Sequence, residues 1–169
     1  MDLHSYTGDV LYSWGSDTNQ AEFADMNFMN SSYDSVRGIL KDTPGEDGGY
    51  GEYKPTEEAE INEGAAKRMA EAMTAGGGEE YTAIQSASLY PTSGATDDWA
   101  YSRHFADPDL NLVHAYTVEF GFGNDAAFCP FYPSAPQYND NIKATNAVFM
   151  ELLLAAVEYG LGDGEGCPK

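Results

Sequence analysis

Ala-Tyr-Thr-Val-Glu-Phe-Gly-Phe spans residues 115–122 and gives the clearest sign of the fold class. Apolar side chains recur at every second position, which is typical of a β-strand with one buried face. The apolar face carries Tyr116, Val118, Phe120 and Phe122, and the opposite face carries Thr117 and Glu119. Taken alone, a carboxylate such as Glu119 most often marks the solvent side of a half-buried strand.

Strand patterns occur elsewhere in the chain as well. Residues 1–12 form an apolar run that holds Asp2, His4 and Ser5, and residues 81–90 form another. Residues 91–96 resemble a turn, and residues 98–101 begin a further short element. We therefore expect at least three strands near residues 1–12, 81–90 and 115–122.

Two segments have helical patterns. Residues 57–75 follow Pro55 and begin with acidic residues, which favour a helix start, and three glycines at 76–78 would end that helix. Residues 141–159 predict a second helix with an apolar stripe at Ile142, Thr145, Val148, Phe149, Leu152, Leu153 and Ala156. Because strands and helices alternate along the chain, the sequence predicts an α/β layer architecture for residues 1–169.

Residues 17–54 differ in character from the rest. They are rich in Asp, Asn, Ser and Gly, and they predict a long acidic surface excursion with one short helix near residues 33–40. The acidic segment at residues 42–52 contains possible calcium ligands, but it lacks the ordered spacing of a calcium-binding loop. We expect it to be a solvated loop.

The chain is strongly acidic, with 28 Asp and Glu residues against 8 Lys and Arg residues. Such a surface repels nucleic acids and anionic membranes and attracts basic peptides. It is also compatible with an extracellular or saline habitat, and a secreted protein is our expectation. The two cysteines, Cys129 and Cys167, either form one disulfide in an oxidising compartment or are unrelated thiols.

One histidine beside Asp2 does not make a metal site, because a structural zinc ion needs about four protein ligands and a catalytic one about three. The segments taken together are more informative. Four of them, in this order, resemble the zinc carboxypeptidases: residues 2–6 with 11–15, residues 90–101, residues 116–120, and residues 128–133 with the helix after them. The resemblance implies the C-terminal half of the zinc carboxypeptidase fold, a mixed β-sheet flanked by helices.

The resemblance also implies roles for individual residues. His4 would be a zinc ligand, and Ser5 and Tyr6 would contact the bound peptide. Tyr90 would fold over the substrate and donate a hydrogen bond to its C-terminal end. Glu119 would be the general base that takes a proton from zinc-bound water and passes it to the leaving amine.

The segment at residues 90–101 resembles the B-type enzymes more than the A-type enzymes. At the position of Asp97 the A-type enzymes carry an apolar residue and the B-type enzymes carry an aspartate. The resemblance therefore implies a preference for peptides that end in lysine or arginine, through a charge-assisted hydrogen bond. In the alternative interpretation, Asp97 turns to solvent in a polar loop.

The family also uses a His-x-x-Glu pair for two more zinc ligands, and arginines that hold the substrate. The chain contains no His-x-x-Glu, and its Arg37, Arg68 and Arg103 lie outside the segments that supply the clamp. We expect the isolated chain to be inactive and to associate with itself or with a missing N-terminal half. The alternative is a truncated, non-catalytic module that binds peptides or a partner chain.

Overall fold

The computed structural model describes residues 1–161 and has an α/β architecture, as the sequence pattern predicted. The strands are β1 (Asp2–His4), β2 (Asp9–Tyr12), β3 (Asn19–Gln20), β4 (Glu52–Tyr53), β5 (Thr82–Gln85) and β6 (Tyr116–Glu119). The helices are α1 (Thr56–Gly77), α2 (Ser86–Leu89), α3 (Thr96–Ala106) and α4 (Ala135–Ala156). A 3-10 turn, η1 (Ser31–Tyr33), and a π-helical turn, η2 (Val157–Leu161), complete the described elements.

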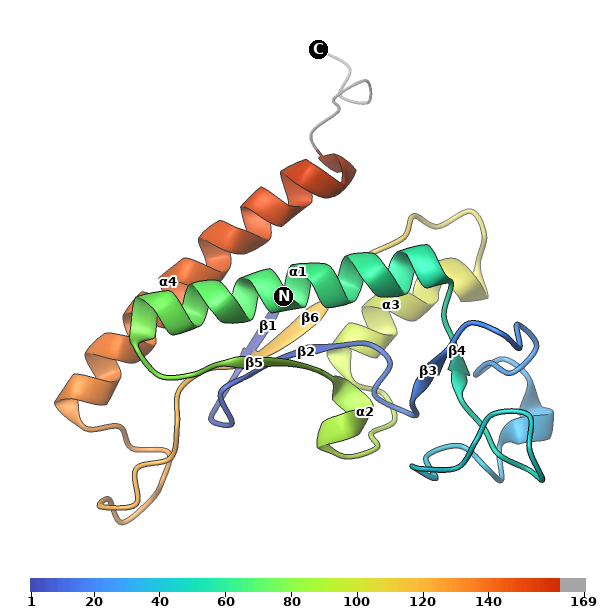
Figure 1. Cartoon of the computed structure of the whole chain (residues 1–169), viewed down its shortest axis with the longest axis horizontal. Helices are drawn as coiled ribbons and strands as arrows, with labels where there is room; N and C mark the ends of the chain where they lie inside the picture. Colours follow the sequence, from blue (N-terminus) through green and yellow to red (C-terminus); the bar gives the residue numbers. More distant parts are fainter. Residues whose placement is uncertain (162–169) are drawn as a thin grey trace.

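Strands β1, β6, β2 and β5 form one mixed sheet in that spatial order (Figure 1). Strand β6 pairs in parallel with β1 and antiparallel with β2, and β2 pairs in parallel with β5. In the β1–β6 register His4 lies opposite Glu119, and each of these residues ends its strand. The topology therefore brings the two together at one end of neighbouring strands.

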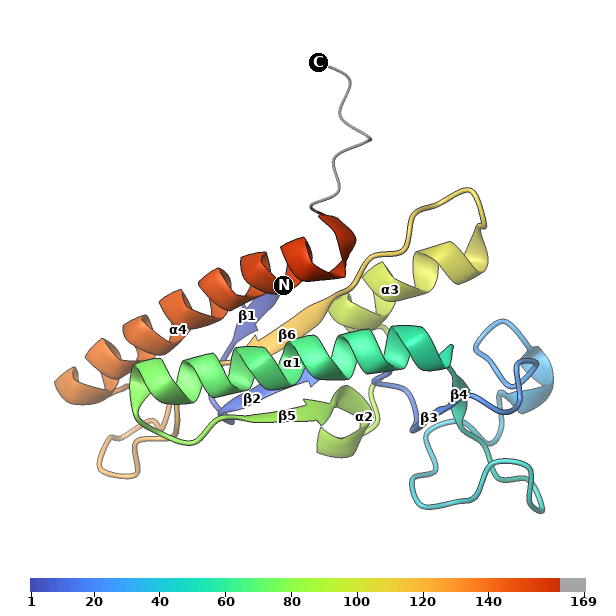
Figure 2. The same cartoon turned by 45° about the horizontal axis from the view of Figure 1, so that its top comes forward.

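Helices α1 and α4 pack together and cover one face of the sheet (Figures 1 and 2). Alternation along β6 turns Tyr116 and Val118 toward these helices, where both are buried. The rest of this buried core is Val10, Ala65, Ala66, Met69, Ala70, Met73, Tyr81, Ala144, Val148 and Ala155. Thr117 and Glu119 consequently point to the other face of the sheet.

Small residues allow α1 and α4 to approach closely. A Cβ atom added at Gly76 would lie 3.2 Å from the Cβ of Ala147, and one added at Gly77 would lie 3.0 Å from the Cβ of Ala144. Helix α1 ends at Gly77 as the glycine run predicted, and Gly78 closes it in the left-handed region with φ of 86°. Gly76 and Gly77 therefore allow the close contact with α4, and Gly78 ends α1.

Helix α4 begins at Ala135, earlier than the predicted start at residue 141. The Ser134 hydroxyl accepts a hydrogen bond from the Gln137 backbone N–H, and the Gln137 side chain accepts one from the Ser134 backbone N–H. This reciprocal pair satisfies two donors at the start of the helix. A serine three residues before a glutamine is therefore the signal that places the true start.

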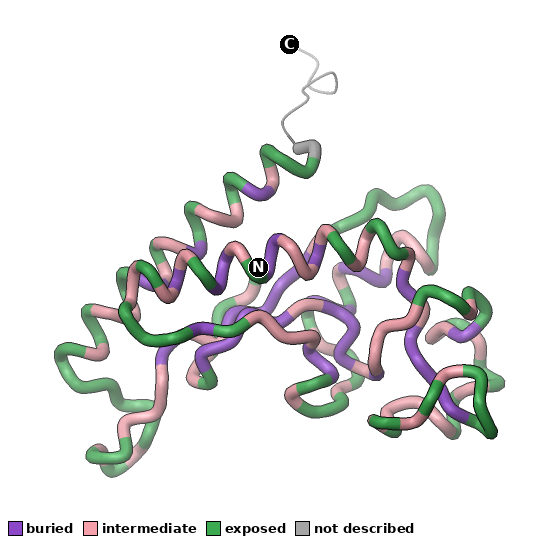
Figure 3. The backbone as a smooth tube through the Cα atoms, in the orientation of Figure 1, coloured by how far each residue is buried: buried purple, intermediate pink, exposed green. Residues whose placement is uncertain are grey.

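The predicted apolar stripe of α4 is only partly buried (Figure 3). The buried residues of the helix are small or β-branched, namely Ala144, Val148 and Ala155, and of these only Val148 belongs to the predicted stripe. Several larger members of the stripe are exposed: Ile142, Phe149 and Leu153. The close approach of α1 and α4 explains this difference, because it leaves room only for small side chains between the helices.

Residues 17–54 form a lobe beyond one end of the sheet, where β3 and β4 pair in parallel (Figure 1). The short helix predicted near residues 33–40 is wrong, since only the η1 turn forms there. Buried Glu52 accepts hydrogen bonds from the Phe28 backbone N–H at 2.7 Å and from the Tyr50 hydroxyl at 2.8 Å. One internal carboxylate thus holds two parts of the excursion together.

Residues 81–90, predicted as a single strand, divide into β5 and the short helix α2. The backbone N–H of Ala87 donates to the Trp14 carbonyl oxygen at 3.1 Å, which ties α2 to the segment after β2. The element expected at residues 98–101 is part of α3, which is longer. Both helices lie beside the candidate site.

None of the helices within residues 1–161 combines the length and apolar character that a bilayer span requires. The disulfide considered between Cys129 and Cys167 involves a residue outside the described range.

Candidate active site

His4 and Glu119 approach each other at the ends of β1 and β6. The Nδ1 atom of His4 lies 3.6 Å from Oε1 of Glu119. The other ring nitrogen, Nε2, lies 3.1 Å from Oδ2 of Asp2, and this hydrogen bond lowers the pKa of the Asp2 carboxyl. A carboxylate on one ring nitrogen orients the imidazole and leaves the other nitrogen for a ligand, as in metal-bound histidines.

The residues around His4 suit a metal ligand but do not complete a zinc centre. In residues 1–161 no group of three or more His, Cys, Asp or Glu side chains is placed to hold a metal ion. A catalytic zinc ion takes about three protein ligands. The described part of the chain therefore offers one oriented histidine, and a zinc ion would need further ligands from elsewhere.

Glu119 is only slightly exposed, at 14% of its side-chain surface. Burial raises the pKa of its carboxyl group, the nearby His4 ring opposes that rise, and the charge of Asp9 adds to it. Desolvation disfavours the ionised form of a carboxyl group and makes it a stronger proton acceptor. The position thus has the electrostatics of a general base.

A pocket of about 230 Å³ opens on the sheet face that points away from α1 and α4. Four of the residues selected from the sequence line it: His4, Tyr90, Asp97 and Glu119. Leu11 and Thr117 from the sheet, Ser86 and Leu89 from α2, and the loop before α3 form other parts of its wall. Segments that are far apart in the sequence therefore line one pocket.

Asp97 lies in the first turn of α3 and is only 2% exposed, so it does not turn to bulk solvent. The Ser86 hydroxyl donates a hydrogen bond to its Oδ2 atom at 2.7 Å. The helix dipole favours an acidic residue at this position. Tyr90 differs from Asp97, because it is largely exposed and follows the end of α2.

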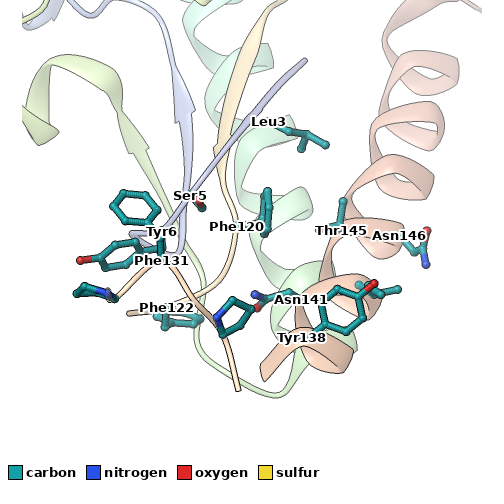
Figure 4. A pocket seen from close by; sticks show the side chains of 13 residues that line it. Leu3, Ser5, Tyr6, Phe120, Phe122, Phe131, Tyr138, Asn141, Thr145 and Asn146 are labelled. Atoms are coloured by element: carbon teal, nitrogen blue, oxygen red, sulfur yellow. The ribbon is translucent and has the colours of Figure 1, made fainter. Parts of the chain in front are cut away.

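Ser5 and Tyr6 line a different groove, with a volume of about 580 Å³, between β1 and the start of α4 (Figure 4). The Tyr6 ring meets the Phe131 ring edge to face, with 4.6 Å between centroids. Phe120 and Phe122 form part of the same apolar lining. The structure therefore separates Ser5 and Tyr6 from the pocket that holds Glu119.

Two charged residues next to the pocket were not selected from the sequence. Both carboxylate oxygens of Asp98 accept the Gly15 backbone N–H, at 2.8 and 2.9 Å. The Lys54 side chain is 1% exposed and donates to the carbonyl and hydroxyl oxygens of Ser13. In the sequence, the neighbouring acidic residue Asp97 could have drawn attention to Asp98. Lys54 ends a polar segment, so nothing in the sequence indicates that it is buried.

Comparison with known proteins identifies the family of this chain. The family model described as zinc carboxypeptidase matches residues 1–146, which is most of the chain. No curated protein matches the chain significantly. The matched range includes every residue selected for the site, from His4 to Glu119. The chain belongs to the zinc carboxypeptidase family.

Proposed function

We propose that this chain carries part of the active site of a metallocarboxypeptidase that removes C-terminal residues, with a preference for lysine and arginine. The observation that carries the proposal is the shared pocket of His4, Tyr90, Asp97 and Glu119. It combines a metal-ligand histidine, a base and a carboxylate that could select a cationic side chain. The family match supports the peptidase assignment in general.

Glu119 is the residue that moves the proton. Its partly buried carboxylate accepts a proton from the attacking water molecule and returns it to the amine that leaves. A zinc ion held by His4 and further ligands would supply Lewis-acid chemistry to that water. Because burial raises the pKa of Glu119, the carboxylate is a better proton acceptor than an exposed glutamate.

Asp97 would recognise the side chain of the C-terminal residue. A lysine ammonium or arginine guanidinium group in the pocket would form a charge-assisted hydrogen bond with its carboxylate, worth roughly 1.5–3 kcal/mol. A phenylalanine or leucine side chain would leave the buried carboxylate without a charged partner, which disfavours binding of that side chain. Tyr90 at the rim is exposed enough to fold over a bound peptide.

The groove that contains Ser5 and Tyr6 would hold residues of the peptide that precede the scissile bond. Its aromatic lining and its position next to β1 support this role. The proposed substrate therefore lies across the end of β1, with its last residue in the smaller pocket.

The ligands that His4 lacks would come from another polypeptide segment, from a missing N-terminal half or from a second chain. The outer edge of β1 has no neighbouring strand among residues 1–161, and it lies next to the groove. A free strand edge can pair with a further strand. The isolated chain is expected to be inactive for this reason.

The second candidate function is a peptide-binding module without catalysis. The incomplete ligand set in the described residues favours it. Activity measurements on peptides ending in arginine distinguish the two, using this chain with and without the polypeptide that supplies the remaining ligands. Hydrolysis that requires both polypeptides and Glu119 supports the enzyme, whereas binding without turnover in either preparation supports the module.

A further inference from the structure

Lys54 follows β4 and is almost completely buried, at 1% exposure. Its ammonium group donates to the Ser13 carbonyl oxygen at 2.7 Å and to the Ser13 hydroxyl at 3.1 Å. The same group lies 4.2 Å from the centroid of the Tyr101 ring, which is a cation–π contact. Lysine is rarely buried unless its charge is compensated, so this position requires an explanation.

The Lys54 cation is affected by the charges of carboxylates on two helices, Glu58 on α1 and Asp97 and Asp98 on α3. Burial lowers the pKa of Lys54 to about 7, and the charges of Asp98, Glu58 and Asp97 oppose that change. For Asp98 burial raises the pKa to about 7, the neighbouring Asp97 adds to the rise, and Lys54 counteracts it. The interior next to the pocket thus holds one cation among several anions.

Lys54 and Asp98 hold the same short turn from opposite sides. Lys54 binds Ser13 at its start, and Asp98 binds the Gly15 backbone N–H at its end. Between them, the indole N–H of Trp14 donates to the Tyr53 carbonyl oxygen at 2.9 Å. The turn therefore links the buried lysine to the first turn of α3.

The first turn of α3 also carries Asp97, which lines the candidate specificity pocket. Asp97 and Asp98 are adjacent and both buried, at 2% and 8% exposure. Two buried carboxylates that lie close together repel each other. A nearby cation reduces that repulsion.

We infer that Lys54 is a positioning residue for the specificity pocket, whose buried charge offsets that of Asp98 and keeps the Asp97 carboxylate directed to a basic ligand. The inference rests on the proposed role of Asp97. Lys54 does not touch the ligand. It acts through the turn at residues 13–15 and through its charge.

The test measures binding of N-acetyl-L-arginine and N-acetyl-L-phenylalanine to the full chain by amide NMR titration. We expect Lys54→Met to weaken binding of the arginine probe by about tenfold, which corresponds to about 1.4 kcal/mol. Binding of the phenylalanine probe should not change. Lys54→Arg should bind both probes like the wild type, because it keeps the charge. Lys67→Met is the matched control, since Lys67 is an exposed lysine on α1.

A double variant distinguishes a specific effect on binding from a loss of folding. Lys54→Met combined with Asp98→Asn removes both charges, so it should fold and should bind the arginine probe like the wild type. If Lys54→Met weakens the binding of both probes equally, or if the double variant does not recover binding of the arginine probe, the inference is overturned. Lys54 then has a structural role only. If the wild type itself does not prefer the arginine probe, the proposed role of Asp97 fails, and the inference fails with it.

Discussion

The Nδ1 atom of His4 and the Oε1 atom of Glu119 lie 3.6 Å apart, across the parallel pairing of β1 with β6. This separation places the imidazole and the carboxylate around a common point at the pocket wall. Since both are fixed at strand ends, their relation depends on the sheet and not on a flexible loop.

Zinc should bind weakly to the chain alone, because the described residues offer His4 without two further ligands. Isothermal titration calorimetry should give no tight one-to-one site, and His4→Ala should change the titration little. Adding the polypeptide that supplies the other ligands should produce a tight site that His4→Ala abolishes. A tight site on the chain alone would contradict the proposed incomplete centre.

Glu119→Gln should lower kcat of the complete assembly by about 10²- to 10⁴-fold, because the amide cannot accept the proton of the attacking water. The KM for a peptide ending in arginine should change little, since Glu119 is not proposed to hold the substrate. Steady-state kinetics measure both constants. Glu60→Gln, at an exposed position on α1, is the control and should leave kcat unchanged.

Asp97→Asn should reduce the preference of the complete assembly for peptides ending in arginine over peptides ending in phenylalanine. The loss of a charge-assisted hydrogen bond of roughly 1.5–3 kcal/mol corresponds to a change of about 10- to 150-fold in the ratio of kcat/KM values. The exposed Asp109→Asn should keep the wild-type ratio. An unchanged ratio in Asp97→Asn would mean that another residue selects the substrate.

Asp98→Asn should flatten the dependence of stability on pH. Burial raises the pKa of Asp98 from 3.8 to about 7, so the folded state binds its proton more tightly than the unfolded state between these values. The free energy of unfolding therefore falls as pH rises through that window. Lys54 is protonated in both states over most of this range, because its folded-state pKa is about 7.

Urea unfolding of the wild type and of Asp98→Asn at pH ~4 and pH ~7 measures this effect. From pH ~4 to pH ~7, the free energy of unfolding of the wild type should fall by on the order of 2 kcal/mol more than that of the variant. Asp109→Asn should follow the wild type. Parallel pH profiles for Asp98→Asn and the wild type would show that Asp98 has no unusual affinity for protons.

Gly77→Ala should destabilise the fold by about 1–2 kcal/mol, although alanine is the better helix former. Its added Cβ would lie 3.0 Å from the Cβ of Ala144, which is fully buried and cannot move away. Gly64→Ala, in the same helix, is the comparison, because its Cβ would meet only the Tyr159 hydroxyl at 3.1 Å. Thermal unfolding should give a lower Tm for Gly77→Ala and an equal or higher Tm for Gly64→Ala.

The main elements were predictable where a periodic pattern and a terminal signal coincide. Strand β6 follows from its alternation, and helix α1 follows from the acidic start after Pro55 and the glycines at its end. Strands β3 and β4 were not predicted, because each has two residues and neither has an apolar alternation. The early start of α4 was missed although Ser134 and Gln137 form a capping box.

The candidate site was only partly predictable, for a different reason. Resemblance to a family selects His4, Tyr90, Asp97 and Glu119, and these residues share one pocket. It does not reveal that Ser5 and Tyr6 line a separate groove, since strand ends and loops set that division. Lys54 was missed because its neighbours in sequence are polar, whereas in space it is buried against two distant segments, at Ser13 after β2 and at Tyr101 in α3.

The environment of Trp14 has a practical consequence for spectroscopy. The chain has two tryptophans; Trp14 is 2% exposed and contacts the rings of Phe28, Tyr101 and Phe105, whereas Trp99 is 62% exposed. The neutral quencher acrylamide should therefore quench the emission of Trp99 more strongly than the short-wavelength emission of Trp14. Because the indole of Trp14 lies in the turn between Lys54 and Asp98, a red shift of its fluorescence reports loosening of that turn without any added label.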